Sequence, residues 1–535
     1  MFQNSGGLQS LLKDGARHYS GVEEAMLKNI EACKQLSTIT RTSLGPYGLN
    51  KMVVNNLEKL FVTTDAATIM KELDVHHPAA RLIVMAAKLQ ETEVGDGTNL
   101  VVILAGELLR MAEELIQTGL HPSDIITGYE KASKYVDSIL HELEVFRVTI
   151  QSDKNQVVKA LTPVIASKVY GYENHLASCV ADACIIVTDS GQRFDLENVR
   201  VVKIQGGVLD QTQTYRGMVI PRPAEGTVKH VKNAKVAVYN CPLDPQQSDT
   251  KGTVLIKTAT ELKNYSRGEE EIAQKLVEDI HAAGIQVLVL GGSVSEIVMH
   301  FLELKSIMVV KINSKFELRR VARMLGAIAV VRLGAPIAEE IGFADEVSSE
   351  EISSTKVTIF RRESETSKVA TIVIRASTQN VMDDTERAID DALNTFRSLT
   401  KDQRFVPGAG ACEAEIAKRV KAYAMSNPGL DQYAVLRYGQ VFEIIPKTLA
   451  ETSGSDPNYI LPKIYAENNF KVGVDVENGQ VKDMSEEVVD HLVTKQWAIK
   501  LASDVALTVL RIDQIIMAKP AGGPNLNKKP VMEDD

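Results

Sequence analysis

The sequence lacks several features that would place a protein in a class at once. Its five cysteines (Cys33, Cys179, Cys184, Cys241 and Cys412) are scattered and have no C-x-x-C spacing. This argues against a disulfide framework or a zinc site and favours a reducing compartment. No uninterrupted apolar stretch approaches the roughly 20 residues of a membrane-spanning helix. The first twenty residues have no basic segment followed by an apolar run, as a secretory signal would. These absences predict a cytosolic protein with no membrane partner.

Positive charge is scarce relative to negative charge. Lys and Arg number 60 against 70 Asp and Glu, which gives a formal net charge of −10. Nucleic-acid-binding proteins usually carry a basic surface, so nucleic acid is not expected as a partner. The composition is otherwise ordinary, with 44% hydrophobic and 24% charged residues. At roughly 100–200 residues per domain, a chain of 535 residues predicts about three or four domains.

Helical patterns occupy both ends of the chain, and strands alternate with helices in the middle. The short apolar runs AKVAVYNCPL, IQVLVLGG, IMVVKIN and AIAVVRL, with helical segments between several of them, predict a parallel α/β unit over about 216–370. Its polar segment 244–271 predicts an exposed helical excursion, and the tail after Pro524 is expected to be disordered. We expect helices over 20–40, 79–91, 98–118, 123–143 (with Ser123 as the N-cap), 380–398, 411–423, 434–449 and 492–512.

The common nucleotide-binding motifs are also missing. The chain has no G-x-x-x-x-G-K-S/T and no G-x-G-x-x-G between a strand and a helix. It has instead three glycine-rich turns, of which VGDGTN (94–99) and VPGAGA (406–411) precede helices and LGPYG (44–48) follows one. The amides at the helix start after Gly97 favour phosphate. Asp96 would repel bare phosphate but attract it through Mg²⁺. The alternative is that Asp96 is a simple helix cap.

Two further acidic positions complete a possible catalytic set. TTDAAT (63–68) places Asp65 directly after an apolar strand, and ERAIDDALNTFR (386–397) places Asp390 and Asp391 within a helix. Adjacent helical residues point about 100° apart, so at most one of this pair is expected to enter a given site. The alternative for Asp391 is a solvated surface charge.

These segments, in this order, resemble the group II chaperonins of the TCP-1 family. The resemblance runs from about residue 17 to 524 and is carried by TSLGPYGLNKMVVN, LFVTTDAATIMKEL, HPAARLIVMAAKLQETEVGDGTNLVVILAGELL, MDDTERAIDDALNTFR, VPGAGACEAEIA and KQWAIKLASDVALTVLRIDQIIMAKPAGGP. It implies a multidomain α/β chain. The domains would be a mostly helical equatorial domain (1–144 and 404–525), a small intermediate domain (145–215 and 371–403), an apical domain with a helical lid protrusion (216–370, protrusion about 244–271) and a disordered tail (526–535).

The resemblance also implies roles for individual residues around ATP or ADP and Mg²⁺. Asp65 and Asp391 would position and deprotonate the attacking water, Asp96 would ligate Mg²⁺, and Lys168 would sense the γ-phosphate. The remaining expected nucleotide contacts are Gly45, Pro46, Tyr47, Gly48, Gly97, Thr98, Asn99, Gly408, Ala409, Gly410, Asp490 and Lys495.

The function implied is that of an ATP-hydrolysing chaperone subunit. Family members form double rings, and a hetero-oligomer with eight paralogous subunits per ring is expected here, enclosing unfolded clients such as actin and tubulin. Asn99 and Leu100 replace two threonines common in the family, and Ala66 and Ala409 replace glycines. A ring scaffold with weak or no ATP turnover therefore stays open as an alternative. The third possibility for the chain is a homo-oligomeric archaeal-type subunit, which these substitutions disfavour.

A basic stripe in the middle of the chain is a candidate client surface. In SKFELRRVARMLGA (314–327), Leu318, Val321 and Leu325 form an apolar stripe. Basic residues recur every fourth position on another face, as expected for neighbours along a helix. We expect Lys315, Arg319, Arg320 and Arg323 to contact acidic client segments, and the alternative is an ordinary solvated face.

Overall fold

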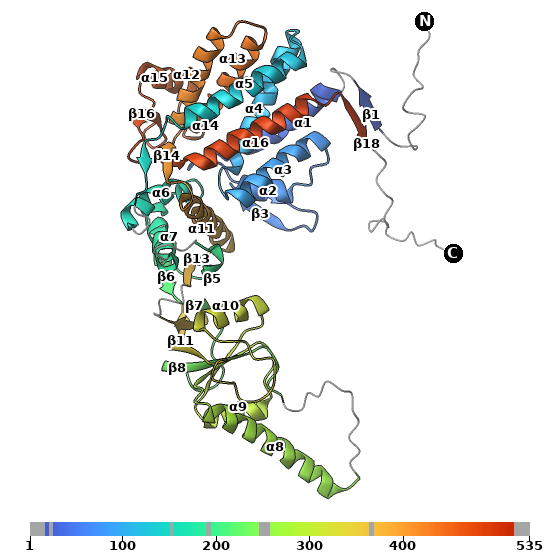
Figure 1. Cartoon of the computed structure of the whole chain (residues 1–535), viewed down its shortest axis with the longest axis vertical. Helices are drawn as coiled ribbons and strands as arrows, with labels where there is room; N and C mark the ends of the chain where they lie inside the picture. Colours follow the sequence, from blue (N-terminus) through green and yellow to red (C-terminus); the bar gives the residue numbers. More distant parts are fainter. Residues whose placement is uncertain are drawn as a thin grey trace, which may run out of the picture.

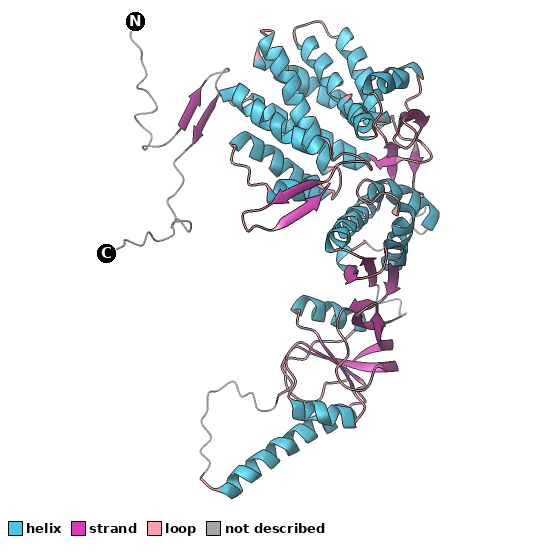
Figure 2. Cartoon of the chain, turned by 180° about the vertical axis from the view of Figure 1, so that it is seen from behind, coloured by secondary structure: helices cyan, strands magenta, loops and turns pink. Residues whose placement is uncertain are grey.

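The computed structural model describes residues 17–20, 25–149, 153–188, 194–244, 257–362 and 369–517. The predicted tail 526–535 and residues 245–256 of the polar excursion lie outside the described residues. The chain forms three bodies in a row (Figure 1). A helical body lies at one end, a smaller body in the middle and an α/β body at the other end. The reverse view shows the same three bodies in the same order, with the largest group of helices at one end (Figure 2).

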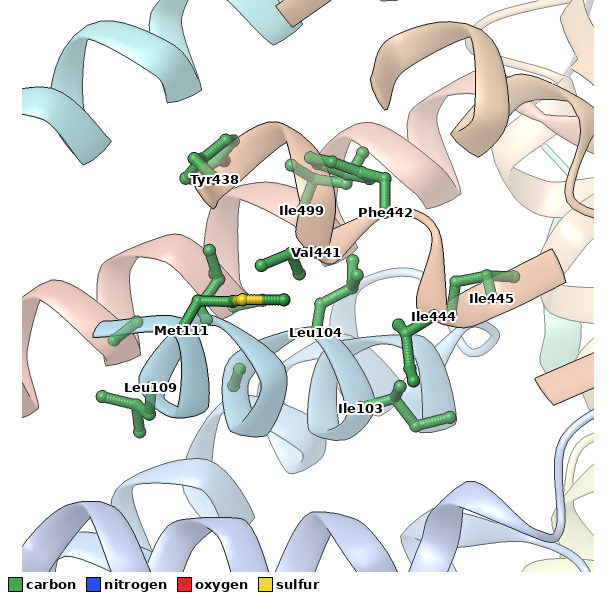
Figure 3. Close-up of a cluster of buried hydrophobic side chains, with 14 of the residues drawn as sticks. Ile103, Leu104, Leu109, Met111, Tyr438, Val441, Phe442, Ile444, Ile445 and Ile499 are labelled. Atoms are coloured by element: carbon green, nitrogen blue, oxygen red, sulfur yellow. The ribbon is translucent and has the colours of Figure 1, made fainter. Parts of the chain in front are cut away.

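The helical body is built from both ends of the chain, as predicted. Its central helix α4 (Thr98–Gln117) is apolar on most sides and lies within the body, as such helices do. Ile103 and Leu104 of α4 share one core cluster with Phe442 and Ile499 from the far end of the sequence (Figure 3). The other helices are α1 (Leu27–Arg41), α2 (Ala66–Glu72), α3 (Pro78–Glu93), α5 (Pro122–Leu140), α12 (Ala411–Ser426), α13 (Asp431–Val441), α14 (Ile444–Thr452), α15 (Pro457–Ala466) and α16 (Leu492–Leu510).

Short antiparallel strands connect these helices. A hairpin of β2 and β3 joins α1 to α2, a second hairpin of β15 and β16 follows α15, and three strands in the order β17-β14-β4 lie beside the second body. The ends of the described chain pair through β1 and β18. The bounds are β1 (Arg17–Ser20), β2 (Lys51–Val54), β3 (Leu60–Thr63), β4 (Phe146–Arg147), β14 (Arg404–Pro407), β15 (Val472–Asp475), β16 (Gln480–Asp483), β17 (Val489–His491) and β18 (Gln514–Met517).

One predicted helix start is wrong by two residues. Helix α5 begins at Pro122, and its N-cap is His121 rather than Ser123. Proline suits the first helical position because its missing N–H has no partner there. The His121 Nδ1 atom accepts a hydrogen bond from the Ser123 amide at 3.2 Å, so the imidazole takes the capping role expected of the serine.

The middle body packs three helices against a three-stranded sheet. Its sheet has the order β5-β13-β6, with β5 and β13 parallel and β6 antiparallel. Leu161, Val180, Phe396 and Ile372 lie in one core cluster, which joins the two chain segments that build this body. The elements are α6 (Lys154–Ala166), α7 (Glu173–Val187), η3 (Leu196–Asn198), β5 (Val199–Gln205), η4 (Leu209–Gln211), β6 (Gln213–Arg216), β13 (Ala370–Ala376) and α11 (Gln379–Leu399).

The third body is α/β, but its sheet is mixed rather than wholly parallel. Strands β8, β9 and β10 are parallel, as predicted, whereas β11 and β12 form an antiparallel pair with a two-residue turn. So short a turn joins only antiparallel strands. The sheet order is β10-β9-β8-β11-β12-β7. Its elements are β7 (Met218–Ile220), β8 (His230–Tyr239), α8 (Ala259–Ala282), β9 (Val287–Leu290), α9 (Glu296–Leu304), β10 (Met308–Lys311), α10 (Lys315–Leu325), β11 (Gly342–Ile352) and β12 (Thr355–Arg361).

Helix α8 begins inside the predicted polar excursion and continues to Ala282, so the helical expectation is confirmed for 259–271. It projects from the end of the third body (Figure 1). None of the helices in the described ranges combines the length and apolarity needed to cross a membrane.

Candidate functional site

A cavity of about 480 Å³ lies between the helical body and the middle body. This volume is typical of a pocket for a small-molecule ligand or cofactor. Segments from distant parts of the sequence form its wall, among them those near residues 45, 65, 96, 168, 391, 409, 475 and 490. The predicted residues that line it are Gly45, Pro46, Asp65, Asp96, Gly97, Thr98, Asn99, Lys168, Asp391, Ala409, Gly410, Asp490 and Lys495.

Three predicted nucleotide contacts do not line this cavity. Gly48 closes the turn after α1, where its amide donates to the Gly45 carbonyl at 3.0 Å. Gly408 lies behind Ala409, and its amide donates to the Val488 carbonyl at 2.9 Å. Tyr47 is exposed, with its ring against that of Tyr170. The basic residues of α10 belong to the third body and are likewise absent from the cavity wall.

Two helix starts meet at the cavity, and each has a residue in the left-handed region. Gly97 has φ 78° at the N-cap of α4, and Gly410 has φ 78° at the N-cap of α12. A Cβ on Gly410 would lie 2.9 Å from Pro446, so glycine is needed there for packing as well as for conformation. The first amides of a helix have no partner within it and carry partial positive charge. Both helix ends therefore favour an anion in the cavity.

Asp96 is not the helix cap that the simpler interpretation expected. The N-cap of α4 is Gly97, and among the described residues the Asp96 carboxylate accepts a hydrogen bond only from the adjacent Gly97 amide, to Oδ1 at 2.6 Å. The Gln90 side chain holds the Asp96 carbonyl at 2.8 Å. The second carboxylate oxygen of Asp96 is thus available to a ligand in the cavity.

Lys168 joins carboxylates from the two bodies. Its Nζ atom lies 2.5 Å from Asp391 Oδ2 and 3.2 Å from Asp65 Oδ1. Asp391 belongs to α11 of the middle body, whereas Asp65 caps α2 of the helical body and accepts from the amide and hydroxyl of Thr68. The side chain of Asp391 is only 15% exposed, so the surface-charge interpretation is wrong. Its neighbour Asp390 lines a second cavity of about 530 Å³ and not the first.

The carboxylates of this cluster differ in pKa. Burial acts to raise the pKa of Asp65, but the Lys168 ammonium and the Thr68 hydrogen bonds outweigh it and leave that pKa lowered. Burial raises the pKa of Asp96 and raises that of Asp391 well above its usual range, with Lys168 opposing both shifts. Burial also acts to lower the pKa of Lys168, which Asp391 and Asp65 reverse. The cluster thus contains three carboxyl groups and a single ammonium group, that of Lys168, so a cation bound in the cavity would improve its charge balance.

The other end of the cavity holds a buried ion pair. Lys495 Nζ lies 2.7 Å from Glu413 Oε1 and 2.9 Å from Asp490 Oδ2. The side chains of Lys495 and Glu413 are 5% and 4% exposed, whereas that of Asp490 is 37% exposed. Lys495 therefore orients Asp490 at the cavity rather than presenting a free ammonium.

Several lining residues were missed by the sequence interpretation. The β15–β16 hairpin contributes Asp475, Val476, Glu477 and Asn478. Its segment VGVDVENGQVKD alternates apolar and polar residues around an Asn-Gly pair, which is the usual signal of a tight hairpin. The signal was present but gave no reason to place the hairpin at this cavity. Tyr170 and Thr494 also line the cavity, although they lie two residues after Lys168 and one residue before Lys495 and were given no role.

Comparison with known proteins shows that the chain belongs to the TCP-1/cpn60 chaperonin family, whose sequence model matches residues 36–520. It is similar to the T-complex protein 1 subunit theta of Dictyostelium discoideum, at 50% identity covering 99% of this chain and 100% of the relative. The subunit theta of Arabidopsis thaliana is 50% identical, and that of Homo sapiens is 49% identical, each covering 97% of this chain and 96% of the relative.

These relatives also confirm a finer prediction. The segments TTDAAT, GDGTN and WAIKLAS predict a likeness to the theta subunit of the eukaryotic cytosolic chaperonin, known as CCT or TRiC, and the identity to three theta subunits over nearly the whole chain confirms that likeness. The mixed α/β, multidomain fold predicted from the sequence is confirmed as well.

Proposed function

We propose that this chain is an ATP-hydrolysing subunit of a cytosolic chaperonin. One observation carries the proposal: Asp65 and Asp96 of the helical body share a cavity with Lys168 and Asp391 of the middle body. Phosphoryl transfer depends mainly on positioning and charge neutralisation, with one group orienting the water. Two helix N-termini supply the anion-binding half of such a site.

Magnesium fits the residues that face the cavity. Within the described ranges, no group of three or more His, Cys, Asp or Glu side chains could hold a metal alone. Mg²⁺ commonly takes one or two carboxylates and completes its shell with water and substrate phosphates. Among the described residues Asp96 has one carboxylate oxygen without a hydrogen bond, and the neighbouring Lys168 already pairs with Asp65 and Asp391. When bound, the ion would neutralise charge on the phosphates while Asp96 holds it in place.

The residues divide the remaining work between two bodies. Asp391 accepts the proton of the attacking water, Asp65 orients that water, and Lys168 neutralises the terminal phosphate. Gly45, Gly97 and Gly410 let the backbone approach the phosphates, and Asp490 faces the ribose. We assign the helical body as equatorial (1–144 and 404–525), the middle body as intermediate (145–215 and 371–403) and the third as apical (216–370). Hydrolysis then requires the intermediate domain to close on the equatorial domain.

The proposed assembly is a hetero-oligomeric double ring of paralogous subunits that folds clients such as actin and tubulin. Purification of the tagged chain from cells under native conditions tests it. We expect a particle with the mass of two rings that contains paralogues of this chain. Recovery of a monomer, or of rings made from this chain alone, would contradict the hetero-oligomer.

A ring-scaffold subunit with weak turnover is the second candidate function. The Asn99 side chain favours it, because its amide donates to Ser43 Oγ at 3.3 Å while its buried Oδ1 atom has no hydrogen-bond partner within the described structure. The threonine hydroxyl that is common at this position is replaced by an amide whose oxygen has no partner among the described residues. Client release by rings carrying Asp391→Ala, compared with parent rings, discriminates the two functions. Equal release favours the scaffold, and slower release favours hydrolysis by this chain.

The basic stripe of α10 gives a prediction about clients. Leu318, Val321 and Leu325 are buried, while Lys315, Arg319 and Arg323 are exposed. Reversing Arg319 and Arg323 to glutamate should reduce crosslinks from α10 to acidic client segments by about fivefold, because an exposed ion pair contributes up to roughly 1 kcal/mol.

The matched control reverses two exposed lysines elsewhere on the apical domain, Lys232 and Lys305. Crosslinking followed by mass spectrometry of the client complexes measures both variants. If the arginine variant keeps client crosslinks at the parent level, the basic stripe is an ordinary solvated face and not a client surface.

A further inference from the structure

One tyrosine of the middle body spans two segments of the equatorial body at the cavity edge. The Tyr170 ring centroid lies 5.1 Å from that of Tyr47, with the ring planes at 50°. The Tyr170 hydroxyl donates to Glu477 Oε1 at 2.6 Å. Tyr47 belongs to the turn after α1, and Glu477 belongs to the turn of the β15–β16 hairpin. Glu477 and Tyr170 both line the cavity.

The two segments that Tyr170 contacts form separate parts of the cavity wall. Gly45 and Pro46 of the first turn line it, as do Asp475 and Asn478 of the hairpin. Tyr170 is 37% exposed and Tyr47 is 39% exposed, so the contact lies at the surface rather than in the core. A side chain placed in this way closes part of the opening between the two segments.

Tyr170 shares a short connection with Lys168. Residues 167–172 join α6 to α7, and this connection touches the equatorial body through the Lys168–Asp65 ion pair and through Tyr170. Gly171 follows with φ 90°, a left-handed conformation that suits glycine, and its amide donates to Glu173 Oε2 at 2.6 Å. Movement of Tyr170 off the equatorial body would carry Lys168 with it.

We propose that Tyr47, Tyr170 and Glu477 form a latch that retains adenine nucleotide in the cavity and holds Lys168 at its working position. The latch is a positioning device rather than part of the chemistry, and it rests on the proposed ATPase function. With the latch closed, nucleotide leaves only after the Tyr170 hydroxyl releases Glu477. With it open, the Lys168–Asp65 ion pair still ties the connection to the equatorial body.

The chemistry of the contact suits repeated opening. The hydrogen bond to Glu477 is the largest cause of the raised pKa of Tyr170, with Tyr47 adding to it. The hydroxyl therefore keeps its proton and donates at neutral pH. A single charge-assisted hydrogen bond at the surface is strong enough to slow release and weak enough to break in each cycle.

The test measures nucleotide residence on this chain within the native assembly. The assembly is loaded with α-labelled 8-azido-ATP, chased with unlabelled ATP for increasing times and then irradiated. Label on the tagged chain is followed after separation of the subunits. Tyr170→Phe keeps the ring and removes the hydroxyl, and it should shorten residence roughly tenfold, which is the effect of losing one hydrogen bond to a charged group. Tyr170→Ala should shorten it further.

A matched control at Tyr172 and two variants of Glu477 distinguish the loss of the latch from a general loss of packing around the cavity. Tyr172 has the same 37% exposure two residues further on and is not among the residues that line the cavity, so Tyr172→Phe should leave residence unchanged. Glu477→Ala should act like Tyr170→Phe, whereas Glu477→Gln keeps a hydrogen-bond acceptor and should retain most of the residence time. The double variant of Tyr170→Phe and Glu477→Ala should shorten residence little more than either single variant does.

Each outcome decides a different statement. Residence at the parent level in Tyr170→Phe, or an equal loss in Tyr172→Phe, overturns the latch and leaves the ATPase function standing. Additive effects of Tyr170→Phe and Glu477→Ala overturn the assigned hydrogen bond. A parent chain that takes no label at any nucleotide concentration overturns the proposed function and the latch with it.

Discussion

Replacing Asp391 by asparagine should lower ATP hydrolysis by this chain about a hundred- to ten-thousandfold, which is the usual effect of removing a positioned general base. Asparagine keeps the shape of the side chain but cannot take a proton from water. Lys168 would retain its pair with Asp65 at 3.2 Å, so the cavity should still bind nucleotide. The expected result is a chain that holds ATP without converting it.

The assay must report on this chain, because its ring neighbours also turn over nucleotide in the proposed assembly. Photo-crosslinked 8-azido-ATP on the tagged chain can be scored as di- or triphosphate by comparing γ- and α-labelled preparations. Asp390→Asn is the matched control: it lies one residue away, and burial raises its pKa to about 6, yet it does not line the nucleotide cavity. An Asp391→Asn chain that accumulates diphosphate at the parent rate would remove Asp391 from the mechanism.

The same substitution predicts a change in pH dependence. Burial raises the pKa of Asp391 well above its usual range, although Lys168 opposes the shift. A carboxyl group below its pKa is protonated and cannot accept a proton from water. Hydrolysis by the parent chain should therefore fall as the pH drops toward that pKa. The residual rate of Asp391→Asn should lack this acidic decline, and the single-turnover rate between mildly acidic and neutral pH measures it.

The sequence was informative wherever the signal was local. The turns at Gly97 and Gly410 precede long helices, and the need for a positive φ and for close backbone approach can be inferred from neighbouring residues alone. The helical ends around an α/β middle follow from apolar periodicity. The antiparallel pair of β11 and β12 was missed because β11, GFADEVSSEEI, is mostly polar and contains no short apolar run.

Contacts between distant segments could not be predicted in this way. Nothing in the pattern of α11 says whether Asp390 or Asp391 meets Lys168, because that depends on how the middle body packs on the helical body. Tyr170 and Glu477 are 307 positions apart, and nothing in the sequence around either residue indicates that they meet. The Asn-Gly hairpin was recognisable as a hairpin, but its place at the cavity depends on α12, α14 and α15.

The buried ion pair of Lys495 carries the second large prediction, and it concerns stability. Lys495→Met should lower the free energy of unfolding of the equatorial body by about 3–5 kcal/mol, because it leaves a buried charge without a partner. That charge is Glu413, which is 4% exposed and whose Oε2 atom already lacks a hydrogen-bond partner among the described residues. Hydrogen exchange in α12 and α16, which carry the two residues, measures the loss locally.

Two companion variants test the cause. Adding Glu413→Gln to Lys495→Met removes the orphaned charge and should recover most of the lost protection, because a neutral amide is far less costly to bury than a carboxylate. Asp490→Asn alone should cost no more than about 1 kcal/mol, since the more exposed partner of Lys495 is solvated by water. If Lys495→Met and Asp490→Asn lowered hydrogen-exchange protection equally, the unpaired charge of buried Glu413 would not be the cause of the loss. Changed solvation of the cavity would then explain the lower stability of α12 and α16. Because Lys495 holds Asp490 at 2.9 Å, the same lysine variant should also shorten nucleotide residence, and Glu413→Gln should not restore that part of the effect.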